Sequence, residues 1–337
     1  MTTTPSTTPL RWGILATGAI AHTFAHDLAL LPDHVVAAAA SRSMERARAF
    51  TDVHGGRPHD SYEALAADPD VDVVYVASPH GRHEQDARLC LEAGKHVLCE
   101  KALTLDAASG RRLADLARER RLFLAEAMWM RTHPVIREVQ RLVADGAVGT
   151  PSLVRAALGF TAPHDVARLW EPELGASALL DIGIYPVTFA HLVLGAPESV
   201  TAAGELHERG FDVSGGATLV HPGGAVSSLA WTQVGDCDDT AAIAGDEGLI
   251  EIGRRFHSPT SFTLTRDGRT ETFTPEVLGE GYAHEAAEVA ACLREGRTES
   301  ALLPLAETIA IQEVMDRMIG QMRDHDVRRR ATSSDLP

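Results

Sequence analysis

Cysteine is scarce in this 337-residue chain: there are four, and no two of them stand in a Cys-x-x-Cys spacing. Four scattered cysteines fit thiols kept as small hydrophobic residues in a reducing compartment, and not a disulfide framework or a zinc knuckle. Residues 1–9 also lack the basic start and apolar run of a targeting peptide, and no apolar run looks long enough to cross a bilayer. We therefore expect a cytoplasmic protein with no membrane partner.

Basic residues are outnumbered as well. The chain has 31 Lys and Arg against 47 Asp and Glu, which gives a formal net charge of -16, and it has no Lys/Arg-rich stripe. Such a charge repels nucleic-acid phosphates, so we expect no nucleic-acid partner. The length and the hydrophobic content of 45% are those of a globular protein with two domains.

The first part of the chain alternates short apolar runs with amphipathic helical stretches, such as residues 20–31. Strands separated by helices are typical of βαβ units and a doubly wound parallel sheet. We therefore predict a Rossmann dinucleotide-binding domain over residues 10–128, after a disordered lead-in at residues 1–9. The predicted strands are residues 12–15, 35–40, 71–77, 96–99 and 122–125.

After a predicted helix at residues 134–145 the pattern changes to alternating strands and hairpins. Asp267-Gly268 between two such strands is a strong hairpin signal. We predict an α+β domain over residues 129–326 with a large, open, mostly antiparallel sheet for substrate binding and oligomerisation, and a flexible tail at 327–337. Its last helix is free to pack back on the Rossmann domain. An open face needs a cover, which predicts a homodimer or larger homo-oligomer. The hairpin strands are residues 218–220 with 225–231, 241–244 with 249–252, and 262–265 with 270–274.

The turn after the first predicted strand resembles a degenerate dinucleotide fingerprint. The fingerprint needs small residues, because the backbone must approach the pyrophosphate and the helix must pack on the strand. Ala16 replaces the first glycine, whereas Gly18 keeps the position of closest phosphate approach. Ala19 and Ile20 begin the following helix and complete the predicted contacts. The alternative is an ordinary Gly/Ala-rich turn.

The end of the second predicted strand favours NADP over NAD. An NAD-binding fold usually has an acidic residue there, to accept hydrogen bonds from the ribose hydroxyls. This chain has Ser41 and Arg42, with Arg46 one turn later. A guanidinium suits the dianionic 2′-phosphate of NADP. The alternative is that Arg42 simply begins a solvated helix.

Four motifs, spread over much of the chain, carry a resemblance to a known family: residues 76–80 with His83, 93–101, 178–186 and 126–131. They resemble the glucose-fructose oxidoreductase/inositol dehydrogenase (Gfo/Idh/MocA) superfamily, and the last of them resembles the branch of dimeric dihydrodiol dehydrogenase and NADP-dependent D-xylose dehydrogenase. The family usually has proline after its Glu-Lys pair, often with a cis peptide, where this chain has Ala102. A cis bond before alanine costs several kcal/mol more than before proline, so the geometry of this peptide stays open.

The resemblance assigns the chemistry. It implies that Lys101 hydrogen-bonds the reacting oxygen, that Tyr185 donates and accepts the proton, and that Lys101 and Glu100 contact the cofactor. Glu100 is also expected to orient Lys101. Asp181 is then expected to hold a substrate hydroxyl or the lysine. Asp181 and Tyr185 are four residues apart, so they share one face if the segment is helical.

Further residues belong to the predicted site with less specific signals. Ser78 and His80 follow the third predicted strand, in the loop that the resemblance places near the nicotinamide. His80-x-x-His83 has no Cys or carboxylate to complete a metal site, so we predict no metal. The predicted substrate contacts, each with a structural alternative in the core or in a solvated loop, are Trp129, Arg131, His164 and Arg168.

Together these features predict an NADP-dependent oxidoreductase. It would transfer a hydride between the nicotinamide and a secondary carbinol or carbonyl of a sugar, polyol or cyclic trans-diol, with Lys101 and Tyr185 handling the proton. One alternative is a ketosugar or other carbonyl reductase of secondary metabolism. Another is a sensor or repressor that binds NADP(H) without turnover, against which Lys101, Asp181 and Tyr185 argue.

Overall fold

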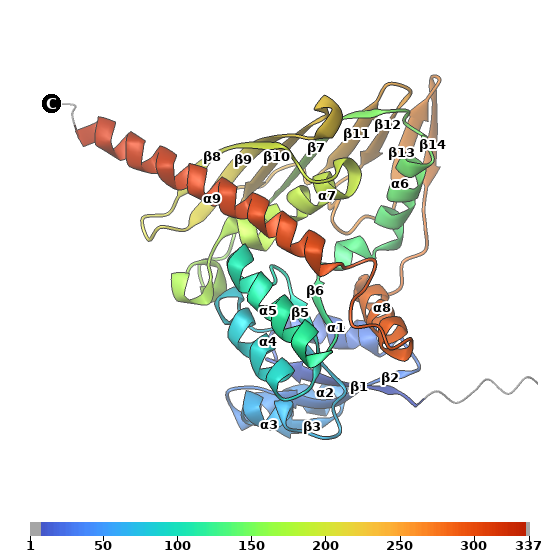
Figure 1. The fold of residues 1–337 in the computed structure, drawn as a ribbon, viewed down its shortest axis with the longest axis vertical. Coiled ribbons are helices and arrows are strands. Elements are labelled where there is room, and N and C mark those ends of the chain that lie inside the picture. Colours follow the sequence, from blue (N-terminus) through green and yellow to red (C-terminus); the bar gives the residue numbers. More distant parts are fainter. Residues whose placement is uncertain (1–7, 335–337) are drawn as a thin grey trace, which may run out of the picture. The chain divides into compact units, whose positions relative to one another are not determined.

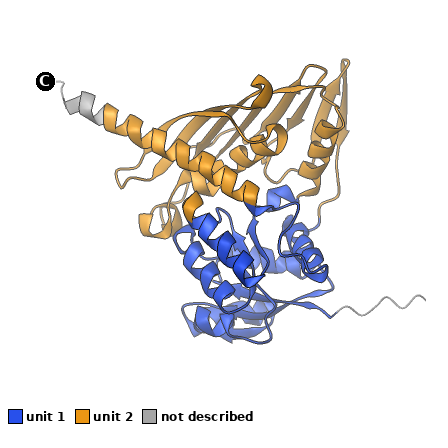
Figure 2. Cartoon of the chain, in the orientation of Figure 1, with its two compact units in different colours: residues 1–103, 109–132, 278–305 blue, residues 104–108, 133–277, 306–337 orange. Residues whose placement is uncertain are grey.

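The computed structural model describes residues 8–334, with side chains to Arg328 (Figure 1). The chain forms two compact units, and each contains a sheet. Unit 1 comprises the chain up to Leu103 and residues 109–132 and 278–305, and unit 2 comprises the rest (Figure 2). Residues distant in the sequence therefore contribute to one unit.

Unit 1 is built on six parallel strands in the order β3-β2-β1-β4-β5-β6. This order reverses between β1 and β4, and doubly wound sheets bind ligands at the carboxyl ends of strands beside such a reversal. The predicted doubly wound sheet is confirmed, with strand ends shifted by one or two residues. The strands are β1 (Leu10–Leu15), β2 (His34–Ala40), β3 (Arg57–His59), β4 (Val73–Val76), β5 (His96–Glu100) and β6 (Leu124–Ala127).

Helices connect these strands, and one helix from the far end of the chain joins them. That helix, α8, packs against α1. Asp27 at the end of α1 is buried and accepts N–H bonds from Glu280, Tyr282 and Ala283. A single carboxylate therefore satisfies the free start of α8. The helices are α1 (Ala19–Leu28), α2 (Met44–His54), α3 (Tyr62–Ala66), α4 (His83–Glu92), α5 (Ala107–Arg120) and α8 (Tyr282–Arg294), with short turns η1 (His80–Arg82) and η2 (Trp129–Arg131).

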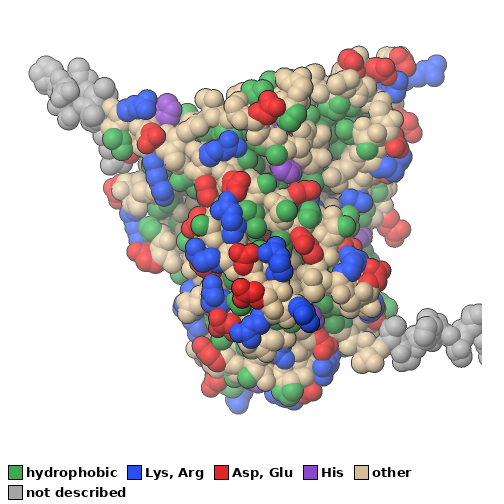
Figure 3. Space-filling model, viewed as in Figure 1, with side chains coloured by type: hydrophobic (Ala, Val, Ile, Leu, Met, Phe, Trp, Pro, Cys, Tyr) green, Lys and Arg blue, Asp and Glu red, His purple; other side chains and the backbone are tan. Residues whose placement is uncertain are grey.

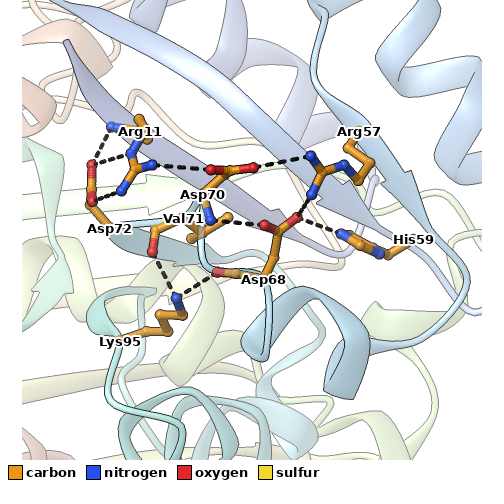
Figure 4. A network of polar contacts seen from close by, with 8 residues as sticks. All are labelled: Arg11, Arg57, His59, Asp68, Asp70, Val71, Asp72 and Lys95. Atoms are coloured by element: carbon orange, nitrogen blue, oxygen red, sulfur yellow. Dashed lines mark hydrogen bonds and ion pairs between the residues drawn. The ribbon is translucent and has the colours of Figure 1, made fainter. Parts of the chain in front are cut away.

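A polar network braces the edge of this sheet at which β1, β4 and β5 begin (Figure 4). Arg11 donates two hydrogen bonds to Asp72, and Lys95 Nζ donates to the carbonyls of Asp68 and Val71 at 2.6 and 2.8 Å. Lys95, part of a family motif, is thus a structural residue. These contacts fasten the amino ends of the strands and leave the carboxyl ends for a ligand. The other members are Arg57, His59 and Asp70.

Unit 2 is built on eight strands in the order β14-β13-β12-β11-β7-β10-β9-β8, of which only the β7–β10 pair is parallel. The large, mostly antiparallel sheet is therefore confirmed. Asp267 and Gly268 form the predicted hairpin with φ values of 51° and 71°. The strands are β7 (Pro151–Gly159), β8 (Ser199–Leu206), β9 (Asp212–Val220), β10 (Val226–Thr232), β11 (Ala241–Gly245), β12 (Gly248–Ile252), β13 (Phe262–Arg266) and β14 (Arg269–Phe273).

Helices lie against this sheet. α7 packs on β7 and β10, and α9 is joined to β8 by hydrogen bonds between Gln321 and the backbone of Val200 and Ala202. α9 continues to Ser334, where the sequence indicated a flexible tail from residue 327. The helices are α6 (Pro134–Ala144), α7 (Ile184–Leu194) and α9 (Leu305–Ser334), with short turns η3 (Ala167–Leu169), η4 (Pro172–Leu174), η5 (Leu179–Gly183) and η6 (Pro222–Gly224).

One helical segment has the length and apolar composition of a membrane span. The helical segment Pro172–Leu194 is long and apolar enough to cross a membrane, which corrects the expectation that no run reaches that length. Within it, 78% of the apolar window is buried in the protein, as in the core helix of a soluble fold.

Figure 3 shows acidic and basic side chains interleaved over the face in view. Of the predicted termini, most of the lead-in at residues 1–9 lies outside the described residues.

Candidate active site

The loop after β1 has the geometry that the degenerate fingerprint requires. Ala16 adopts a φ of +71°, the left-handed conformation that a glycine would adopt without strain. Gly18 is the N-cap of α1 and provides no capping side chain. A Cβ added at Gly18 would meet no protein atom within 4 Å. Free N–H groups at the start of a helix, with open space beside them, suit a pyrophosphate.

At the carboxyl end of β2, two guanidinium groups stand next to a helix start. Ser43 Oγ caps α2 by accepting the Arg46 N–H at 3.3 Å. The side chains of Arg42 and Arg46 are exposed, and within residues 8–328 neither forms a hydrogen bond or an ion pair. Ser41, the residue that follows β2, is buried. Two unpaired cations here fit a phosphate on the ribose.

The loop after β4 turns its histidines toward the backbone of the next motif. His80 Nε2 lies 3.0 Å from the carbonyl oxygen of Lys101, and the two ring nitrogens of His83 lie 2.8 and 2.7 Å from those of Ala102 and Ser78. The Lys101–Ala102 peptide, whose geometry the sequence left open, is cis. Burial lowers the pKa of His83, against the two carbonyl contacts that raise it. Both histidines thus contact main-chain carbonyl groups at or beside Lys101.

Lys101 follows β5 at the carboxyl edge of the sheet, directly after a buried glutamate. Glu100 Oε2 accepts the Lys101 backbone N–H at 3.1 Å, and Glu100 Oε1 accepts the hydroxyl of Tyr75. Tyr75 is fully buried on β4 and stacks on Phe24 with ring centroids 3.8 Å apart. Burial and the neighbouring Glu100 carboxylate raise the pKa of Tyr75 well above its usual value. Glu100 is thereby fixed in place behind Lys101.

Two residues predicted to contact the substrate are buried in unit 1. Trp129 is 5% exposed and stacks against Tyr282 of α8 with centroids 4.7 Å apart. Arg131 is also 5% exposed, and its Nε donates to the carbonyl of Leu302 at 2.8 Å. These contacts tie α8 and the loop after it to η2, the short turn that follows β6. Contact of either residue with a substrate stays a prediction.

Unit 2 brings together two residues that the sequence singled out separately. Arg168 Nη1 donates to Asp181 Oδ1 at 3.0 Å. Asp181 lies in η5, a π-helical turn, and Tyr185 lies in the first turn of α7 that follows it, so the segment is helical as expected. π-Helical turns are rare and often mark functional sites. Tyr185 is 6% exposed, and its ring lies 4.9 Å from that of His257.

His164 lies in the loop between β7 and η3. Its exposed ring stacks on Trp170 with centroids 4.6 Å apart, and Trp170 Nε1 donates to the Pro163 carbonyl at 2.9 Å. Beyond these contacts, no group of three or more His, Cys, Asp or Glu among the described residues is placed to hold a metal ion.

The family models match most of the chain. One, an oxidoreductase family with an NAD-binding Rossmann fold, matches residues 10–127, and one for the Gfo/Idh/MocA C-terminal domain matches residues 136–251. The chain belongs to the Gfo/Idh/MocA oxidoreductase family. This confirms the resemblance to the superfamily that the sequence motifs indicated.

Two named relatives and one solved structure are similar to this chain over more than nine-tenths of its length. The chain is 39% identical to trans-1,2-dihydrobenzene-1,2-diol dehydrogenase of Xenopus laevis, over 93% of this chain and 98% of that protein. It is 35% identical to the NADP⁺-dependent D-xylose 1-dehydrogenase of Hypocrea jecorina, over 93% of this chain and 92% of that protein. A solved structure of a 3-ketoreductase of Actinomadura kijaniata, in complex with TDP-benzene and NADP, is 29% identical to this chain. It superposes with a TM-score of 0.81 and covers 94% of this chain and 97% of that one.

Sequence reasoning missed three residues that shape the site. Tyr75 looked like one more apolar residue of a buried strand, and His257 lies in a loop without a motif. Asp212, the first residue of β9, belongs to no motif, yet its side chain is buried. Each contacts a site residue or its turn across at least 25 positions of the chain, which no local pattern reveals.

Proposed function

We propose that this protein is an NADP-dependent oxidoreductase. It transfers a hydride between the nicotinamide and a secondary carbinol or carbonyl of a sugar, polyol or cyclic trans-diol. The names of relatives that share 35–39% of its sequence over more than nine-tenths of its length support this class of reaction. The structural observation that carries the cofactor is the unpaired state of the Arg42 and Arg46 guanidinium groups beside the open Gly18 loop.

The residues at three strand ends fit NADP. The Gly18 loop and the first N–H groups of α1 would hold the pyrophosphate, and Ser41, Arg42 and Arg46 the ribose phosphate. Ser78, whose buried Oγ has no hydrogen-bond partner among the described residues, is a polar group available at the end of β4. When bound, NADP supplies the hydride carrier of the reaction.

The proton is the protein's part of the reaction. We assign Lys101 to the hydrogen bond on the reacting oxygen, Tyr185 to proton transfer with that oxygen, and Asp181 to a substrate hydroxyl. The fixed backbone of Lys101 and the ion pair of Asp181 with Arg168 support these roles, because a catalytic group must be held in one orientation. His164, Trp129 and Arg131 complete the proposed substrate contacts.

Assembly is a further part of the proposal. The strands of unit 2 alternate buried with exposed side chains, and Arg155, Ser228 and Ala230 lie on the exposed face. We propose that a second copy covers this face in a homodimer, because an antiparallel sheet buries one or both faces. Light scattering at micromolar concentration tests the dimer, and a monomer would contradict it.

The four cysteines are free, which supports a cytosolic location.

A cofactor-reduction screen tests the function. The purified chain is mixed with NADP⁺ or NAD⁺ and with D-xylose, inositols or trans-1,2-dihydrobenzene-1,2-diol, and reduced cofactor is followed by absorbance. We expect turnover with at least one of these compounds and a preference for NADP⁺. Tight NADPH binding, measured by fluorescence, without turnover in either direction would instead support a sensor.

A further inference from the structure

Asp212 is a buried carboxylate to which the proposed chemistry assigns no role. It is the first residue of β9 and is 3% exposed. Its carboxylate accepts hydrogen bonds from Ser177 Oγ at 2.5 Å, from the Leu179 N–H at 2.7 Å and from Trp231 Nε1 at 3.0 Å. All three donors belong to unit 2, and the sequence separates them from Asp212 by 35, 33 and 19 positions.

Two of these donors stand at the start of η5. The N-cap residue of this turn, Ala178, makes no side-chain capping bond. Asp212 supplies the missing acceptor from β9, and Ser177 Oγ in turn accepts the Leu180 N–H at 3.1 Å. A carboxylate at the start of a helical turn satisfies free N–H groups and interacts favourably with their dipoles. The turn fixed in this way carries Asp181 and leads into α7.

The third donor extends the contact to the far end of the turn. The indole of Trp231 lies against the backbone at Gly183, where an added Cβ would be 2.9 Å from its Cγ. It also lies against Gly215 of β9, where an added Cβ would be 2.4 Å from its Cζ2. Because Nε1 binds Asp212, one carboxylate fixes both the first residue of η5 and the ring against which its last residue packs.

We propose that Asp212 is a positioning residue that holds Asp181 and Tyr185 in their reactive orientation through η5 and Trp231. This inference rests on the roles proposed above for Asp181 and Tyr185. A π-helical turn is an uncommon conformation that its surroundings must maintain. Removing the carboxylate would leave three buried donors without an acceptor, and the turn would rearrange to satisfy them.

The burial of Asp212 agrees with a role other than stability. Burial raises the pKa of Asp212, against the hydrogen bonds from Ser177, Trp231 and Leu179 that lower it. A buried charge adds little to the stability of a fold, because desolvation offsets much of what its partners contribute. The orientation of the catalytic turn is the property that this carboxylate controls.

The test compares variants that remove the carboxylate with variants that keep its geometry. Asp212→Ala removes the acceptor. In Asp212→Asn, the side-chain oxygen still accepts from Leu179 and Trp231 while the amide donates to Ser177 Oγ. Trp231→Phe keeps an aromatic ring at this position and removes the Nε1 donor together with the second ring of the indole. The kcat and KM for D-xylose or the dihydrodiol, the Kd for NADPH and the melting temperature are measured, with turnover recorded well below each melting temperature.

We expect kcat to fall about 10- to 100-fold in Asp212→Ala, since a displacement of about 1 Å has an effect of that order. In Asp212→Asn it should recover to within a few-fold of wild type, while the NADPH Kd stays unchanged in both. A purely structural role would lower the melting temperature and leave kcat of the folded protein intact, which would overturn the proposal. If Asp212→Ala does not fold, Trp231→Phe decides: a several-fold loss of kcat supports the proposal, and wild-type kcat overturns it.

Tyr185→Phe separates this inference from the proposed function. If that variant keeps wild-type turnover, the proposed role of Tyr185 is wrong. If it loses turnover while Asp212→Ala keeps it, the function stands and the positioning role of Asp212 is wrong.

Discussion

Arg168 Nη1 donates a hydrogen bond of 3.0 Å to Asp181 Oδ1, and the two side chains differ sharply in exposure, at 48% and 9%. The guanidinium is therefore largely solvated, while the carboxylate it orients is nearly buried. An exposed partner of this kind contributes little to stability, on the order of 0–1 kcal/mol. Its effect should appear in the orientation of Asp181.

Arg168→Ala should accordingly leave the melting temperature almost unchanged and lower kcat/KM by about 10-fold, the loss of roughly one charge-assisted hydrogen bond. Arg209→Ala is the matched control, because Arg209 pairs with Glu171 and Glu173 at the same loop and does not contact Asp181. Steady-state kinetics of both variants decide. Equal losses in the two would mean that the loop as a whole, and not the Asp181 contact, matters.

Arg42→Ala should weaken NADP binding about 10- to 100-fold, because a charge-assisted contact contributes about 1.5–3 kcal/mol. NAD binding should change little, since NAD lacks the 2′-phosphate. Arg57→Ala provides the control, because Arg57 on the neighbouring strand β3 already pairs with Asp68 and Asp70. Titration calorimetry with both cofactors measures the effect. The role of Arg42 is excluded if the affinities for NADP and NAD fall together.

Ala16→Gly should stabilise unit 1 by up to about 1 kcal/mol, because glycine adopts a φ of +71° without the Cβ strain of alanine. Ala19→Gly, at the exposed start of α1, should instead destabilise by roughly 0.5–1 kcal/mol. Urea unfolding compares the two. A loss of stability in Ala16→Gly would show that this strain is absent in solution.

Glu285 predicts a pH dependence of stability. It is fully buried, neither carboxyl oxygen has a hydrogen-bond partner among the described residues, and burial, then Glu100 and Asp27, raise its pKa well above the usual value. Between the unfolded pKa, about 4.3, and the raised folded pKa, only the unfolded chain releases this proton, so stability falls as pH rises.

Glu285→Gln cannot release a proton and should escape this loss. The difference in the free energy of unfolding, variant minus wild type, should grow as pH rises from about 4 to 8, by up to about 1.4 kcal/mol per pH unit below the folded pKa. Urea unfolding at a series of pH values measures it. A difference independent of pH would mean that Glu285 ionises normally in the folded protein.

The sequence predicted the parts of the fold that depend on local pattern. The apolar runs became β1, β2, β4, β5 and β6, since a buried parallel strand needs a continuous apolar stretch. β3 was missed, because its residues Arg57, Pro58 and His59 carry no apolar pattern at a sheet edge. The Arg- and Ser-containing end of α9 looked like a flexible tail, but arginine and alanine favour helix.

The site shows the same division. Lys101, Asp181 and Tyr185 stood in motifs and could be named from the sequence. The partners that hold them come from distant positions: Tyr75 binds Glu100 across 25 residues, and Asp212 binds the start of η5 across 33. A buried carboxylate looks like any surface Asp or Glu in a sequence, because its burial is decided by tertiary packing.

Lys101→Met tests the central claim most directly. Methionine keeps the length and packing of the side chain and removes the ammonium group that we propose hydrogen-bonds the reacting oxygen. The measurement is kcat for NADP⁺ reduction with the preferred alcohol from the screen, together with the NADPH Kd. We predict a fall in kcat of about 10²–10⁴-fold with an NADPH affinity within a few-fold of wild type. Near-normal turnover by the Lys101→Met variant would contradict the account.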